Sequence, residues 1–284
     1  MAERSPERCQ PVKRVGLLVH PKLPRSQELA QALRAELEGR GTSLWVASAW
    51  GEAEIQERIA DLDLLVTLGG DGTILRVARI AAPYGVPILG VNFGRRGFLA
   101  EIEPEEALEK VPLVLDGNYW LEERMMLQAE LFRNGERLGV YEALNDVFVG
   151  RGAVPKAVRL AVSIDGNSLT TYVADGVLVA TPTGSTAYSL AAGGPVIAPQ
   201  LRSLLFMPIV PHLTLLRSLV LPPEARVRIQ VFTDHDAVLT LDGQVSIELQ
   251  DEDIVEATAS PHTAPFIRLQ PQSRFYETLL EKLR

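Results

Sequence analysis

The first 120 or so residues alternate between short apolar runs and segments with helical spacing. The apolar runs lie at 15–21, 43–48, 62–70 and 86–94, and the helical segments between them lie at 26–41, 52–59 and 73–82. A short apolar run is typical of a parallel strand that is buried on both faces. Strands that alternate with helices at this spacing are joined by right-handed crossovers. The sequence therefore predicts a parallel, Rossmann-like α/β domain over residues 1–120.

The pattern changes near residue 121 to consecutive strands with few helices. Strand patterns occur at 125–132, 137–150, 158–165, 168–173, 176–182, 227–232, 237–249 and 253–260. The dipeptides Asn134–Gly135 and Asp165–Gly166 indicate hairpin turns, and a short helix is expected near 186–192. A β-rich domain is therefore predicted over 121–264. The amphipathic segment 273–284 predicts a C-terminal helix, and we expect residues 265–284 to pack back onto the first domain.

The composition limits the kinds of partner. The chain has 284 residues, 46% of them hydrophobic, and a formal net charge of −8, which argues against general binding to nucleic acid or an anionic membrane. The apolar stretch Leu204–Leu221 is interrupted by prolines, a histidine and an arginine, so it predicts core packing or a subunit interface rather than a membrane span. The single cysteine, Cys9, excludes an internal disulfide, and the polar N-terminal segment has no signal-peptide core. We expect a cytoplasmic protein.

Two glycine-containing loops follow predicted strands of the first domain. One is Gly69–Thr73, which reads GGDGT, and the other is 92–97, which begins with Asn92. Ligands of open parallel sheets bind beyond the carboxyl ends of the strands. Glycines let the backbone approach a phosphate, and the N–H groups at a helix start complete an anion cradle. The alternative is a tight turn in which Asp71 or Thr73 caps the helix. Three glycines around one carboxylate favour a phosphate-binding function.

Two further segments carry unusual polar groups. Residues 175–189 hold six hydroxyl side chains within nine positions, 181–189, which suits a base, a sugar edge or a phosphate. The alternative is a short helix whose hydroxyls bond to its own backbone. Asn145 and Asp146 are adjacent in an apolar run, so in a strand they point to opposite faces, and a buried one needs a partner. A bulge or turn is the alternative there.

Together these segments resemble the NAD kinases. The shared order is GGDGT at 69–73, GVNFGRRGFL at 90–99, the pair at 145–146, PTGSTAYSLAAGGP at 182–195 and LDGQ at 241–244. The resemblance runs from about Val15 to Phe275. The 182–195 segment is the specific one, because phosphofructokinases and lipid kinases related to diacylglycerol kinase carry loops similar to GGDGT. The resemblance implies transfer of the ATP γ-phosphoryl group to the adenosine 2′-hydroxyl of NAD, with Mg²⁺, in a homodimer or homotetramer. Polyphosphate as an alternative donor stays open.

The resemblance also implies roles for single residues. Asp71 matches the catalytic aspartate, treated as the general base, and Asn145 and Asp146 match an Asn-Glu pair that holds the substrate ribose. The other implied substrate- and cofactor-binding residues are Gly70, Gly72, Thr73, Arg76, Asn92, Lys156, Asp175, Thr183, Ser185, Thr186, Ala187, Tyr188, Ser189 and Gln244. No protein ligand for the metal is predicted, because Mg²⁺ on ATP is held largely by phosphates and water.

The chain departs from the family pattern at two places. Asp146 stands where the family has Glu, so this carboxylate is one methylene shorter. Arg95 and Arg96 stand where the family has a small or apolar residue before GFL, which adds two cations beside the expected phosphate site.

Two alternative functions fit part of the sequence. A kinase of the same superfamily that acts on a lipid or a sugar would share GGDGT but has no reason to carry the 182–195 segment. A non-catalytic dinucleotide-binding regulator would keep the hydroxyl-rich segment but would not need Asp71.

Overall fold

The computed structural model describes residues 12–94, 97–154, 156–211 and 218–282. The chain forms two compact units. The first comprises the chain up to Glu123 together with the chain from Ala264 onward, and the second is Arg124–Thr263. Each unit has its own buried apolar cluster.

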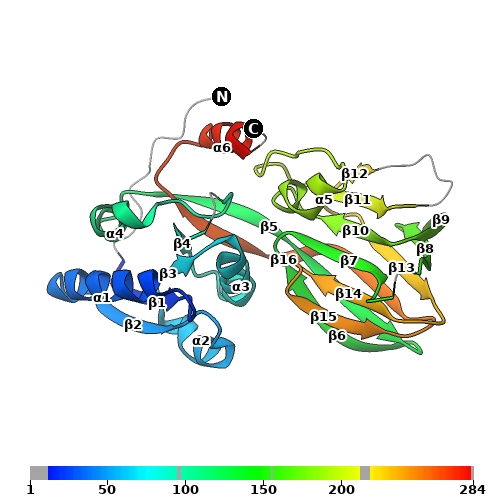
Figure 1. Cartoon of the computed structure of the whole chain (residues 1–284), viewed down its shortest axis with the longest axis horizontal. Helices are drawn as coiled ribbons and strands as arrows, with labels where there is room; N and C mark the ends of the chain where they lie inside the picture. Colours follow the sequence, from blue (N-terminus) through cyan, green and yellow to red (C-terminus); the bar gives the residue numbers. More distant parts are fainter. Residues whose placement is uncertain (1–11, 95–96, 155, 212–217, 283–284) are drawn as a thin grey trace. The chain divides into compact units, whose positions relative to one another are not determined.

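The first unit contains a parallel sheet with helices and three short 3₁₀ turns (Figure 1). Its strands are β1 (Arg14–Val19), β2 (Ser43–Ser48), β3 (Leu64–Gly69), β4 (Ile88–Asn92) and the last part of β16 (Ile254–Arg268). Its helices are α1 (Pro24–Gly39), α2 (Glu52–Arg58), α3 (Asp71–Ala81), α4 (Ala107–Leu115) and α6 (Arg274–Lys282), and its 3₁₀ turns are η1 (Ile59–Asp61), η2 (Ala82–Tyr84) and η3 (Pro104–Glu106).

The parallel α/β architecture predicted for the N-terminal part is confirmed. The strands pair in the order β2-β1-β3-β4-β16, and each of these pairs is parallel. β3 and β4 are buried at every position, which explains their unbroken apolar runs. Gly69 and Asn92 are paired residues at the carboxyl ends of β3 and β4, so the two glycine-containing loops start side by side.

Helix α4 and the start of α3 correct the sequence interpretation. α3 begins at Asp71, two residues before the predicted start, because Gly70 takes the extended N-cap conformation. No helix was predicted over α4, which contains Pro112 and follows a capping box between Glu103 and Glu106. The C-terminal helix α6 is present, and the Phe275 ring lies 6.0 Å from the Phe98 ring.

The second unit is β-rich, as predicted. A six-stranded antiparallel sheet has the order β12-β11-β10-β7-β14-β15, and a second group of strands has the order β16-β13-β8-β9, with β5 pairing β16 and β6. Their bounds are β5 (Trp120–Arg133), β6 (Glu136–Ala143), β7 (Asp146–Arg151), β8 (Val158–Ile164), β9 (Asn167–Ala174), β10 (Gly176–Ala180), β11 (Leu204–Ile209), β12 (Leu219–Leu221), β13 (Val227–Phe232), β14 (Ala237–Leu241) and β15 (Val245–Leu249). β5 and β16 carry the chain between the two units.

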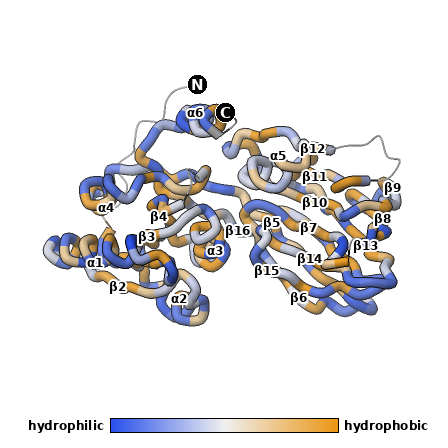
Figure 2. The backbone as a smooth tube through the Cα atoms, viewed as in Figure 1, coloured by the Kyte–Doolittle hydropathy of each residue, from blue (hydrophilic) through white to orange (hydrophobic). Residues whose placement is uncertain are grey.

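Burial alternates along the strands of this unit. In β13 and β14 every second residue is buried. Figure 2 shows hydrophobic and hydrophilic positions following one another along the strands of this unit. The buried side chains of both groups of strands form one apolar cluster. The predicted short helix is observed as the 3₁₀ turn η4 (Gly184–Thr186) followed by α5 (Tyr188–Ala191).

Two strand predictions in this unit were wrong in detail, and one buried strand was missed. The run 137–150, predicted as one strand, is divided into β6 and β7 at Leu144–Asn145, and the two strands belong to different sheets. The run 237–249 is a hairpin of β14 and β15, turning at Asp242 and Gly243 with positive φ angles of 53° and 64°. The apolar run at 204–209 is a fully buried strand, β11, which was not predicted. Its burial supports core packing for that part of the apolar stretch.

Among the helices of the described ranges, none is long and apolar enough to cross a membrane.

Candidate functional site

In the first unit, the loop between β3 and α3 packs closely against the loop that follows β4. The Phe93 N–H donates to the Gly69 carbonyl at 3.1 Å. A Cβ atom on Gly94 would lie 3.3 Å from the Gly70 Cα, so glycine at both positions lets the two backbones approach. The Gly70 carbonyl accepts from the Thr73 and Ile74 amides, which closes the first turn of α3. Both loops therefore lie at the edge of the sheet where ligands of such folds bind.

Asp71 is held in one direction by this second loop. Its carboxylate accepts hydrogen bonds from the backbone N–H of Phe98 at 2.8 Å and from that of Leu99 at 3.3 Å. A Cβ atom on Gly97 would overlap the Asp71 carboxylate, so glycine at that position leaves the carboxylate room to take this direction. The side chain remains half-buried rather than closed off from solvent. Asp71 is thus a carboxylate fixed by two amides at the start of a helix.

The other predicted residues of this unit lie at the end of β4 or in the first part of α3. Asn92 is buried, donates to the Glu103 carboxylate at 3.2 Å and accepts from the Gly94 amide at 3.1 Å. Its side chain therefore fixes the start of the loop. Thr73 is buried, whereas Gly72 is exposed. The Arg76 guanidinium lies over the Trp50 ring, 5.4 Å from its centre.

In the second unit, a pocket of about 270 Å³ brings together four of the predicted residues. These are Asn145, Asp146, Ala187 and Tyr188. Four residues that the sequence analysis did not single out complete the lining, namely Phe148, Thr240, Asp242 and Gly243. The Tyr188 ring is 45% exposed and lies edge-on to the Phe148 ring, with 6.0 Å between the ring centres.

Asp146 is a buried carboxylate in this pocket. It is the first residue of β7 and is 6% exposed. Among the described residues, no group donates a hydrogen bond to its side chain. Burial, and to a lesser degree the charge of Asp242, raises the pKa of Asp146 to about 7. A buried carboxylate without donors is unfavourable unless a ligand supplies them, so the pocket suits a ligand with hydroxyl groups.

Asp242 is a residue of the site that the sequence analysis missed. Its carboxylate accepts from the backbone amides of Leu144, Asn145 and Asp146, at 2.7 to 3.2 Å. These bonds explain why the predicted strand is interrupted at this point. Through these bonds Asp242 shapes the wall that carries Asn145 and Asp146. The Asp-Gly turn in LDGQ was the available sequence signal.

Most hydroxyls of the 182–195 segment are already hydrogen-bonded within the chain. Ser185 donates to the Pro182 carbonyl at 2.6 Å and accepts from the Ile197 amide at 2.9 Å. Thr186 donates to the Thr183 carbonyl at 3.1 Å. Arg124 donates to the Thr183 hydroxyl, and the Ser189 hydroxyl donates to the Met207 sulfur. These hydroxyls support the local fold, and the segment presents Ala187 and Tyr188 to the pocket.

Three predicted residues outside the 182–195 segment also do not line the pocket. Lys156 is exposed and pairs with Asp234 at 2.6 Å, and its hydrogen bond lowers the pKa of Asp234 to about 2. Asp175 pairs with Arg151 at 2.9 Å. Gln244 lies in the hairpin turn between β14 and β15. The predicted cations Arg95 and Arg96 lie outside the described residues.

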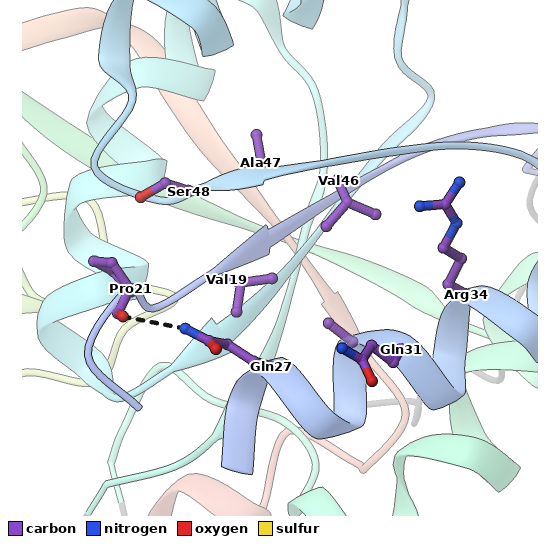
Figure 3. Close-up of a pocket in the computed structure, with 9 residues that line it drawn as sticks. Val19, Pro21, Gln27, Gln31, Arg34, Val46, Ala47 and Ser48 are labelled. Carbon is purple, nitrogen blue, oxygen red and sulfur yellow. Dashed lines mark hydrogen bonds between the residues drawn. The ribbon is translucent and has the colours of Figure 1, made fainter. Parts of the chain in front are cut away.

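A larger pocket in the first unit, of about 440 Å³, lies between α1 and the edge strand β2 (Figure 3). Gln27 and Pro21 both line it, and the Gln27 side chain donates to the Pro21 carbonyl at 3.2 Å. The one ionisable side chain in its lining, Arg34, already pairs with Glu38. This pocket offers no carboxylate to a reacting hydroxyl, so we do not place the chemistry there.

No group of three or more His, Cys, Asp or Glu side chains within the described ranges is arranged to hold a metal ion. A magnesium ion that arrives on ATP needs no such cage, because phosphate oxygens and water supply most of its ligands.

The amino-acid sequence matches known protein families and their members. Residues 1–119 match the ATP-NAD kinase N-terminal domain, and residues 144–269 match the ATP-NAD kinase C-terminal domain. The NAD kinase of Chloroflexus aggregans is 41% identical over 273 residues, covering 96% of this chain and 99% of the relative. The chain belongs to the NAD kinase family. The NAD kinase of Dehalococcoides mccartyi, a second member, is 40% identical, with 96% of both chains covered.

Two solved structures have a similar fold. Yeast NADH kinase, solved in complex with NADH, superposes with a TM-score of 0.85 at 27% identity, covering 96% of this chain and 88% of the yeast chain. An NAD kinase from Archaeoglobus fulgidus, solved in complex with ATP, superposes with a TM-score of 0.76 at 24% identity, covering 93% of this chain and 96% of the other. These likenesses confirm the predicted fold.

Proposed function

We propose that this chain transfers the γ-phosphoryl group of ATP to the adenosine 2′-hydroxyl of NAD, giving NADP and ADP. Membership of the NAD kinase family supports this reaction, since relatives at about 40% identity over nearly the whole chain are NAD kinases. The observation that carries the proposal is the geometry of Asp71, an oriented carboxylate in a glycine loop at the ligand edge of a parallel sheet.

Asp71 is the proposed catalytic residue. Phosphoryl transfer depends mainly on positioning and on charge stabilisation. Two amides fix the direction of the carboxylate, and its remaining lone pairs can accept the proton of a substrate hydroxyl. In the reaction the 2′-oxygen forms a bond to the γ-phosphorus while the bond from that phosphorus to the β,γ-bridging oxygen breaks. The hydroxyl proton passes to Asp71, and ADP leaves.

The pocket around Asp146 is the proposed binding site for hydroxyl groups of NAD. The Asp146 carboxylate is buried and lacks donors among the described residues, and ribose hydroxyls would supply them. Asn145 adds a side-chain amide, and the exposed Tyr188 ring adds an apolar face against which a base or sugar can pack. The shorter side chain at 146 suits a hydroxyl that reaches into the pocket.

Magnesium enters this proposal as part of the Mg-ATP substrate. Gly70, Gly72 and the first turn of α3 would face the phosphates, as expected at a helix N-terminus. Arg76 on the same helix is a proposed phosphate neighbour.

Homo-oligomeric assembly and a cytoplasmic location are further parts of the proposal. Exposed apolar side chains on either side of β11 and on β12 support assembly, with Val210 at 66% and Val220 at 60% exposure. The single cysteine in the sequence suits a reducing compartment. Sedimentation of the purified chain tests the assembly, and a monomer at micromolar concentration would contradict it.

The reaction is tested by product analysis with purified protein, Mg-ATP and a panel of acceptors. We expect NADP from NAD, and no phosphorylation of diacylglycerol or fructose 6-phosphate. NADH as acceptor and polyphosphate as donor are run beside them to define the specificity. Asp71→Asn should lower kcat by about 10²–10⁴-fold while NAD still binds. Asp61→Asn, an exposed aspartate of the same unit, is the matched control. Binding of NAD without formation of NADP by the wild-type chain would overturn the proposal in favour of a regulator.

A further inference from the structure

Leu99 connects the proposed catalytic carboxylate to a buried charge cluster in the same unit. The Leu99 amide donates to Asp71 at 3.3 Å, and the Leu99 carbonyl accepts from Nη1 of Arg268 at 2.8 Å. Leu99 itself is 2% exposed. Leu99, whose amide helps to orient Asp71, is therefore hydrogen-bonded through its carbonyl to Arg268, which lies 169 positions later in the chain.

Arg268 is itself fixed from several directions. Its Nε donates to Glu122 at 2.7 Å, its Nη1 lies 3.3 Å from a Glu101 oxygen, and its guanidinium stands over the Phe266 ring at 5.2 Å. The other Glu101 oxygen accepts from the amides of Leu269 and Gln270 at 2.7 and 2.8 Å. Burial alone lowers the pKa of Arg268, but the charges of Glu122 and Glu101 outweigh it and raise the pKa overall.

The burial of this charge cluster is not explained by a gain in the stability of the fold. The side chains of Arg268, Glu101 and Glu122 are 7%, 6% and 8% exposed. Burying charges carries a desolvation penalty that apolar residues of the same volume avoid, so a buried ionic group is weak support for stability. The planar guanidinium of Arg268 contacts a carbonyl and two carboxylates at once, so it fixes the positions of these groups relative to one another. The carbonyl is that of Leu99, so Arg268 fixes the orientation of the backbone at Leu99.

The loop concerned needs such an anchor. It contains Gly94 and Gly97, and glycine leaves the backbone free to adopt other conformations. The amides of Phe98 and Leu99 can orient Asp71 only if the backbone that carries them is fixed. A misplacement of about 1 Å at a reacting group can cost on the order of 100-fold in rate.

We propose that Arg268 is a positioning residue for phosphoryl transfer, acting through Leu99 to hold the Asp71 carboxylate in its reactive direction. This inference rests on the proposed function, because it takes Asp71 to be the catalytic carboxylate. Arg268 is buried, and its proposed role is to set the geometry of the carboxylate that acts on the substrate.

The first test compares two arginine-to-lysine variants in the full chain. Arg268→Lys keeps the charge but loses the fork that spans Leu99 and the two glutamates. The matched control is Arg133→Lys, because Arg133 makes a two-point ion pair with the fully buried Asp253 at 2.8 and 2.7 Å and bonds to none of the candidate site residues. We expect Arg268→Lys to lower kcat about tenfold with KM for NAD within about twofold, and Arg133→Lys to change kcat by less than about twofold.

Thermal unfolding of both variants separates positioning from general destabilisation. Similar losses of Tm with a kcat loss in Arg268→Lys alone support the inference. Equal kcat losses in the two variants overturn it.

The second test is a double-mutant cycle with Asp71→Asn, whose residual activity is followed over long incubations. If Arg268 acts through Asp71, Arg268→Lys should lower the residual kcat of Asp71→Asn by less than about twofold, because the group being positioned is already gone. A tenfold loss in both backgrounds overturns the inference. Asp71→Asn with wild-type kcat would instead reject the proposed function of Asp71, whatever Arg268→Lys does.

Discussion

The two units each present one aspartate of special interest, and the surroundings of these aspartates are opposite. Asp71 has two backbone amides that fix its direction. Asp146 is buried with no donor among the described residues, and its pKa is raised to about 7. A carboxylate with fixed partners is suited to act on a bound group, whereas one without partners is suited to bind groups that carry their own hydrogens. On this basis we propose catalysis for the first site and recognition for the second.

The largest expected effect concerns the space around Asp71. Gly97→Ala places a methyl group where the Asp71 carboxylate now lies, so either the carboxylate or the loop must move. We expect kcat to fall by about 100-fold or more, since a displacement of this size misplaces a reacting group. Gly39→Ala is the matched control, because a Cβ atom there meets nothing within 4 Å. Steady-state kinetics measure both, and an active Gly97→Ala enzyme would break the assignment of catalysis to this loop.

A smaller effect is expected at the wall of the second site. Asp242→Asn replaces a carboxylate that accepts three backbone amides by a group with one acceptor oxygen. We expect the free energy of unfolding to fall by about 2–3 kcal/mol, because amides near the buried residues Leu144 and Asp146 lose their acceptor. Asp251→Asn is the control, since Asp251 accepts one exposed amide, that of Thr233. Chemical denaturation measures the free energy of unfolding of both variants. Equal decreases would show that the three amide bonds to Asp242 stabilise the fold no more than the single exposed bond to Asp251.

The smallest effect is a pH dependence of NAD binding. The pKa of Asp146 is raised to about 7 in the free protein. The ionised carboxylate accepts from hydroxyls on both of its oxygens, whereas protonation turns one oxygen into a donor and weakens the other as an acceptor. Affinity is therefore full above pH 7 and is lost as the pH falls through 7. With a pKa near 7, we expect the Kd for NAD to rise about tenfold between pH 8 and pH 6.

Calorimetric titrations at pH 6, 7 and 8 measure this dependence, with Asp146→Asn as the variant that should lose it. A pH-independent Kd in the wild-type chain would mean that Asp146 is not the group that binds the ribose.

The sequence predicts those parts of the structure whose contacting residues are close together in the chain better than those whose contacting residues are far apart. The parallel domain and its glycine loop are local patterns, and apolar runs followed by Gly69–Thr73 were enough to predict them. The interruption at Leu144–Asn145 was not predictable in the same way, because its cause, Asp242, lies 96 to 98 positions away from the amides that it holds. Arg268 and Leu99 are farther apart still.

The hydroxyl-rich segment shows a second limit. Its composition told us which groups are present but not which are already used. Ser185 and Thr186 bond to their own backbone surroundings, so the neighbouring Tyr188 and Ala187 face the pocket instead. The raised pKa of Asp146 likewise follows from burial, and the sequence Asn145–Asp146 alone does not specify how deeply the carboxylate is buried.

The contrast between the two aspartates is tested most directly by one pair of variants measured side by side, Asp71→Asn and Asp146→Asn, with kcat and KM for NAD determined at pH 8. We expect Asp71→Asn to lower kcat by about 100-fold or more with KM within about threefold, which is the signature of an interaction made in the transition state. We expect Asp146→Asn to raise KM about tenfold with kcat within about threefold, which is the signature of uniform binding. An Asp71→Asn enzyme with near-wild-type kcat would contradict the account.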